Sequence, residues 1–152
     1  MQTWGAWNAD WIWSLGLIAV TITIHVVGIG LIVIAIERFM ARLVRSLPAY
    51  LGSLPATIAL MVTVTLALAV LHGIESMTWA VAYVWLGALQ SPADAALYSV
   101  DSMTTRGASG LVLERGWRMM GAVEAGDGML LFGISTAFLF YVMTRLWKTE
   151  ER

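Results

Sequence analysis

The chain has 152 residues, of which 59% are hydrophobic and 12% are charged, with a formal net charge of −1. Soluble domains carry about 25% charged residues, so this composition predicts a protein embedded in a lipid bilayer, and the charge gives no indication of a nucleic-acid partner. The sequence has no cysteine, which excludes disulfides, thiolate zinc sites and a cysteine nucleophile.

The first predicted membrane span covers residues 11–36, which is long enough to cross a bilayer with some tilt. It follows a cluster of tryptophans that is typical of an aromatic belt at one membrane face, with a ligand-stacking cluster as the alternative: Trp4, Trp7, Trp11 and Trp13. His25 is the sole ionisable residue within the span. It is interpreted either as a hydrogen-bonded packing residue beside Gly28 and Gly30 or as a proton-sensing or lining residue.

Residues 37–52 form a predicted cytoplasmic connection. Arg38, Arg42 and Arg45 lie within this short stretch, and basic residues next to a span mark the cytoplasmic side. Apolar residues between the arginines favour an interfacial helix. We expect Pro48 to end it.

The second hydrophobic run covers residues 55–89. A helix of that length would measure about 50 Å, against a hydrocarbon core of about 30 Å, so we expect a tilt, a kink at Gly73 or a projection beyond the membrane. His72 and Glu75 share one face of this helix with Trp79. A carboxylate here needs a partner, which indicates a structural hydrogen bond from His72 or another element, or else a gating or proton-linked role.

A short helix is predicted over residues 92–103. Ser91 is a good N-cap residue, Pro92 suits the first helical position, and Asp94 follows Ser91 by three residues, as in a capping box. At about 18 Å the helix cannot span a bilayer. The polar sequence TTRGASG, Thr104 to Gly110, then ends it, so the pattern predicts a re-entrant segment between two spans.

The third predicted span covers residues 117–146. Glu124, Asp127 and Ser135 share one face with Leu131, which indicates a face toward a pore or toward the rear of the re-entrant loop. We expect the two carboxylates to act as counter-charges for Arg106 or Arg118 or to attract cations, with chelation of a metal as the alternative.

Glycines at 126, 128 and 133 lower the helix propensity of this span, and the candidates for a pore-lining or hinge role there include Gly128 and Gly133. They allow close packing or a hinge. The basic residues Arg145, Lys148 and Arg152 follow the span. Together with the earlier arginines they predict a multi-pass protein of the cell (inner) membrane, with its N-terminus outside and its C-terminus in the cytoplasm.

The stretch ALYSVDSMTTRGASG, followed by a tryptophan and LLFGISTAFLF, resembles the pore module of the tetrameric potassium-channel superfamily. The likeness covers residues 72–147 and is closest to small bacterial ion-channel proteins. Against the family pattern TTLGYGD, the chain keeps Thr104, Thr105 and Gly107. The remaining four filter positions differ: Arg106, Ala108, Ser109 and Gly110.

The resemblance implies an all-α homotetramer with three transmembrane helices, a re-entrant pore helix and a filter loop. Residues 1–52 would form the N-terminal span and linker, and residues 53–152 the pore module. In such channels backbone carbonyls replace the hydration shell of an ion, which requires alternating residues in left-handed backbone space. Gly107 meets this requirement, whereas Ser109 would be strained there.

Arg106 is the most consequential replacement, because four guanidinium groups facing one axis would repel each other. We expect its side chain to point away from the axis and to pair with Asp101, with Glu75 and Glu124 as the competing partners. The sequence as a whole then predicts a cation-permeable pore, binding at most a permeant monovalent cation, with weak or no potassium selectivity.

Three alternatives stand beside this prediction. They are a non-conducting homologue or assembly subunit with a closed filter, anion conduction through a ring of Arg106 side chains, and a membrane enzyme. No nucleophile–base pair and no metal-ligand set stands out in the sequence, so we expect neither enzymatic activity nor a metal or other cofactor.

Overall fold

The structure, a computed structural model, describes residues 4–46, 54–107 and 110–150. This part of the chain forms four α-helices and one short 3-10 helix: α1 (Trp4–Ser46), α2 (Leu54–Trp85), α3 (Pro92–Met103), η2 (Arg115–Trp117) and α4 (Arg118–Glu150). Three stretches are long and apolar enough to cross a membrane: Ala9–Arg42, Leu54–Trp85 and Arg115–Arg145. The prediction of an all-helical chain with three candidate spans is thereby confirmed.

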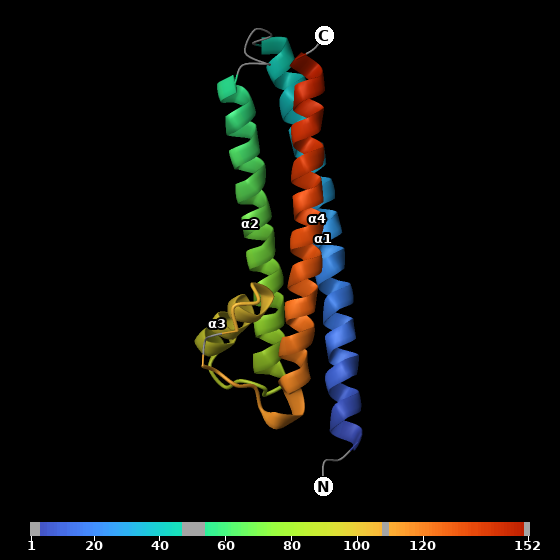
Figure 1. The fold of residues 1–152 in the computed structure, drawn as a ribbon, viewed down its shortest axis with the longest axis vertical. Helices are drawn as coiled ribbons and strands as arrows, with labels where there is room; N and C mark the ends of the chain where they lie inside the picture. The colour runs from blue at the N-terminus through green and yellow to red at the C-terminus, as the bar shows by residue number, and fades with distance from the viewer. Residues whose placement is uncertain (1–3, 47–53, 108–109, 151–152) are drawn as a thin grey trace.

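The three long helices run side by side along the length of the molecule, and α3 packs at one end of the bundle (Figure 1). That end also holds the N-terminus of α1, the C-terminal end of α2 and the start of α4. The C-terminus lies at the opposite end. The chain therefore leaves α2, folds back through α3 and re-enters the bundle as α4 on the same side.

The helix α1 continues without a break through residue 37 to Ser46. The predicted interfacial helix is therefore an extension of the first span rather than a separate element, because nothing in its described sequence stops a helix. The expected end at Pro48 lies outside the described residues.

The expected kink at Gly73 is wrong, since α2 is continuous from Leu54 to Trp85. One glycine costs a helix only about 1 kcal/mol relative to alanine, while an open backbone group in hydrocarbon costs several. The helix ends instead in a turn at Gly87, whose φ of 70° suits glycine. The amides of Ala88 and Leu89 both donate to the Tyr83 carbonyl there.

The short helix α3 has the predicted bounds and the predicted N-cap. The Ser91 side chain accepts a hydrogen bond from the Asp94 amide at 3.3 Å, and Pro92 occupies the first helical position. After the loop, η2 leads into α4, whose Met119 amide donates to Asp10 Oδ2 at 3.1 Å. A carboxylate from α1 thus caps the start of α4, an arrangement that suits the positive end of a helix.

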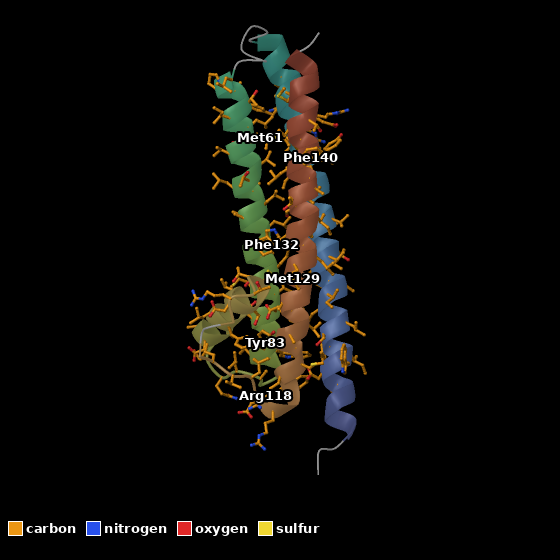
Figure 2. All side chains as sticks on the ribbon, in the orientation of Figure 1. Met61, Tyr83, Arg118, Met129, Phe132 and Phe140 are labelled. Carbon is orange, nitrogen blue, oxygen red and sulfur yellow. The ribbon has the colours of Figure 1, made fainter. Side chains whose placement is uncertain are left out.

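The largest apolar core lies at the end of the bundle that holds α3. Trp79, Tyr83, Met120 and Leu131 are fully buried there among side chains of all four helices. Figure 2 shows Tyr83 at the level of α3 and Phe132 further along the bundle. This core anchors α3 against α2 and α4, which fixes the position of the loop that follows it.

Candidate functional site: the loop after α3 and a buried polar network

The C-terminal end of α3 lies deep alongside the two helices that flank it. Ser99 Oγ donates to the Ser76 carbonyl at 2.6 Å, and Ser76 lies nine residues before the end of α2, about 14 Å along its axis. A Cβ placed on Gly128 would collide with the Met103 backbone, and Gly128 lies about 15 Å into α4. The loop that begins at Thr104 therefore starts about 14–15 Å along the bundle from the end of α2 and the start of α4.

The loop backbone alternates between ordinary and left-handed conformations. Thr105 has a φ of 58°, Gly107 of 61° and Gly110 of 72°. A positive φ is a genuine outlier for a β-branched residue such as threonine and costs about 1–3 kcal/mol. Thr105 and Gly107, two positions apart, thus both have the left-handed backbone that the filter hypothesis requires. Thr105 is strained in that conformation.

Arg106, between these two residues, pairs with Asp101 as predicted. Its Nε lies 3.1 Å from Asp101 Oδ1; the Arg106 side chain is 64% exposed and that of Asp101 only 4%. The Arg106 and Gly107 amides both donate to the Asp101 carbonyl, at 2.9 and 3.2 Å. Asp101 therefore holds the start of the loop through both its side chain and its backbone.

The competing partners of Arg106, Glu75 and Glu124, are engaged elsewhere. Of the other filter positions, Gly110 is exposed, and the predicted roles of Ala108 and Ser109 fall outside the described residues. The Arg118 guanidinium donates to the Leu113 carbonyl at 3.4 Å. The expectation that the acidic pair on α4 neutralises Arg106 or Arg118 is therefore wrong.

Glu124, on α4, instead contacts residues of α2 and α3 and so links the three helices. Its carboxylate accepts a hydrogen bond from Tyr83 Oη at 2.6 Å, and Ser99 Oγ lies within hydrogen-bonding distance of its other oxygen. The side chain is fully buried, so it does not line a surface of this chain. It contacts both α2 and α3, and its hydrogen bonds hold α3 against the bundle.

Asp127, one turn further on, ties α4 to α1 and α2. Its Oδ2 accepts from Thr21 Oγ1 at 2.6 Å and from Trp79 Nε1 at 3.1 Å. Its side chain is also buried. The two α4 carboxylates thus face the interior of the bundle and bind different helices, and the lining role predicted for them does not hold in this chain.

The two histidines and Glu75 form the next polar layer. His25 Nδ1 lies 2.8 Å from Glu75 Oε1, and His72 Nδ1 lies 3.0 Å from Glu75 Oε2. Ser135 Oγ lies 3.0 Å from His72 Nε2 and 3.3 Å from His25 Nε2. The expected His72–Glu75 pair is present, and we name the four residues the His–Glu–Ser ring. Ser135 completes this ring inside the bundle rather than lining a path.

The glycines of α4 differ in their surroundings. Gly128 contacts the Met103 backbone so closely that no Cβ fits, whereas a Cβ at Gly126 or Gly133 would meet nothing within 4 Å in this chain. The close-packing interpretation therefore holds at Gly128. A hinge there has no support, since α4 is a continuous helix.

Most side-chain contacts of this region were not predicted, among them those of α1: Asp10 with the start of α4, Thr21 with Asp127, and His25 with Glu75. Only the unusual polarity of Thr21 and His25 within a span could have indicated them. Comparisons with protein-family models, curated proteins and solved structures give no match to this chain.

Proposed function

We propose that this protein is a channel-like membrane protein that forms a cation-permeable pore with weak or no potassium selectivity. The observation that carries the proposal is the strained, alternating backbone of Thr105 and Gly107 at the buried end of a helix too short to cross a membrane. Strained backbone persists where the surrounding structure enforces it and gathers at functional sites.

The electrostatics of the loop favour a cation over an anion. The C-terminal end of α3 carries the negative end of the helix dipole, and its last turn contains no basic residue. The one arginine of the described loop, Arg106, is paired with Asp101. Because this pair is neutral, the partial charge of the helix end and the loop carbonyls dominate the field at that depth.

The pore requires several chains, since three spans and one half-length helix cannot enclose a path. Residues 104–107 are exposed in the single chain, and backbone at membrane depth must be buried in protein or line water. We therefore propose a homotetramer in which four loops surround one axis. Its proposed orientation in the cell membrane has the N-terminus and the loop entrance outside.

Ion flux through proteoliposomes tests this function. We expect K⁺ and Na⁺ to leave liposomes that contain the purified protein far faster than they leave protein-free liposomes, with no comparable loss of Cl⁻. Flux of neither cation would support the alternative of a non-conducting assembly subunit, and Cl⁻ flux would support an arginine-lined anion pore.

A pair of glycine variants links the flux to the loop. Gly107→Ala places a Cβ at a φ of 61°, which costs about 1–2 kcal/mol per chain. Summed over four chains, this strain exceeds about 1.4 kcal/mol, which corresponds to about a tenfold change in rate. We therefore expect at least a tenfold loss of flux. Gly116→Ala in η2 is the control, because its φ is ordinary and a Cβ there meets nothing within 4 Å. Equal flux in both variants would show that conduction does not depend on this loop.

A further inference from the structure

The four contacts of the His–Glu–Ser ring need one more hydrogen, or another positive charge, than its side chains supply. Four close contacts join its members: each histidine Nδ1 with one oxygen of Glu75, and each histidine Nε2 with the hydroxyl of Ser135. A neutral imidazole has one N–H, a serine has one O–H, and a carboxylate has no hydrogen. The ring thus offers three hydrogens for four contacts, whichever tautomers the histidines adopt.

The contact without a hydrogen bond can be located. His72 Nδ1 and Glu75 Oε2 are buried and have no hydrogen-bond partner in the described part of the chain, although they lie only 3.0 Å apart. If His72 carries its hydrogen on Nε2, toward Ser135, two lone pairs face each other across this distance and repel unless a cation lies between them. Both ion-pair partners of Glu75 among the described residues are histidines, so no lysine or arginine there supplies the charge.

We propose that His25, His72 and Glu75 bind a first-row divalent metal ion, of the class of Zn²⁺, with Ser135 holding the two imidazoles in place. One donor atom from each of the three residues lies within 4.8 Å of the others. Two imidazole nitrogens and a carboxylate oxygen are the ligand set of many zinc sites that keep a fourth position open. The imidazoles disfavour Mg²⁺ and Ca²⁺, which prefer oxygen ligands.

Ser135 supports this assignment because metal-binding histidines use their second ring nitrogen to contact an outer hydrogen-bonding group, which fixes the ring and the tautomer. Its hydroxyl contacts the Nε2 atoms of both histidines, so both Nδ1 atoms face Glu75. Zinc–ligand distances of about 2.0–2.2 Å place tetrahedral donors about 3.4 Å apart. Each histidine Nδ1 lies closer than this to a Glu75 oxygen, at 2.8 and 3.0 Å, so these donors must move apart by about 0.5 Å to admit the ion.

Metal content and a cobalt spectrum test the site. The untagged protein is stripped with a chelator in detergent, dialysed against buffer containing ZnCl₂, and assayed for zinc by mass spectrometry. We expect about one zinc ion per chain and a higher melting temperature after loading. Co²⁺ in place of Zn²⁺ should give the visible absorption bands of a four-coordinate site. The sequence contains no cysteine and two histidines, so tag-free protein has no other imidazole or thiol ligands.

Two ligand variants and a control make the result specific. His25→Gln and His72→Gln should each weaken zinc binding by at least about 100-fold, since losing an outer-shell group alone costs 10–100-fold. Glu37→Gln, which removes an exposed carboxylate of α1, should bind like the wild type. If a ligand variant does not fold, the wild-type stoichiometry and cobalt spectrum still decide. Folded wild-type protein that binds no zinc and shows no cobalt bands would overturn the proposal, and a proton would then be the ring's missing charge. Neither result depends on whether the protein conducts ions.

Discussion

The contact between Gly128 of α4 and the end of α3 positions the loop that follows α3, and one added methyl group tests it. In Gly128→Ala the new Cβ would lie 2.9 Å from Met103 Cα and from its carbonyl carbon, and closer still to its oxygen. These are backbone atoms, so no side-chain rotation relieves the collision. The variant must therefore push α3 away from α4.

The expected magnitude follows from two opposing terms. Forcing extra atoms into a packed interior costs about 1–3 kcal/mol, occasionally more, while replacing glycine by alanine in a helix gains about 1 kcal/mol. Gly126→Ala has the second term alone, because a Cβ there meets nothing within 4 Å. We expect the free energy of unfolding of the two variants to differ by about 1–3 kcal/mol, with Gly126→Ala the more stable.

Unfolding in mixed detergent micelles, followed by circular dichroism or tryptophan fluorescence, measures this difference. Hydrogen exchange of the α3 amides should also accelerate in Gly128→Ala and not in Gly126→Ala, since the displaced helix loses its packing. Equal stability and equal exchange in the two variants would show that α3 does not pack on Gly128, and the position assigned to the loop would then be wrong.

Three further predictions concern the loop after α3, the polar network and the proposed orientation. Asp101→Asn and Arg106→Leu should each destabilise the protein and the double variant should recover the loss, with a coupling of about 1 kcal/mol because Arg106 is largely exposed; additive effects in this cycle would exclude the pair. Tyr83→Phe removes a donor from a buried carboxylate and should cost about 1–3 kcal/mol in thermal or denaturant unfolding, while Tyr141→Phe, at a half-exposed position, should leave stability unchanged. A single cysteine at Glu114, in a chain without native cysteine, should react with an impermeant maleimide added outside intact cells; labelling solely after lysis would reverse the proposed orientation.

The sequence predicted α3 to the residue because its signals are local. Ser91 and Pro92 act within one turn of the helix start, and the polar loop after Met103 marks its end. The Arg106–Asp101 pair could also be predicted, since its members are five positions apart at a helix end. The break predicted at Gly73 does not occur, because a single glycine destabilises a helix only weakly, whereas a backbone group without a hydrogen bond is costly in hydrocarbon.

The partners of the buried charges could not be derived in the same way. His25 and Glu75 are 50 residues apart, and their contact depends on how α1 and α2 are rotated about their own axes. Glu124 was predicted to face a pore because the sequence shows which α4 residues share its face. The sequence does not show which residues of α2 and α3 it contacts. Helix periodicity gives the residues that share a face, but packing decides which helix that face meets.

The central claim is that four copies of the re-entrant loop surround one axis, and a cryo-electron-microscopy map of the purified protein in lipid nanodiscs tests it most directly. We expect four chains related by four-fold symmetry, with the backbone carbonyl groups of residues 104–107 around the axis and the Arg106 side chain directed toward Asp101. A single chain, or an assembly in which these loops face lipid away from the symmetry axis, would contradict it.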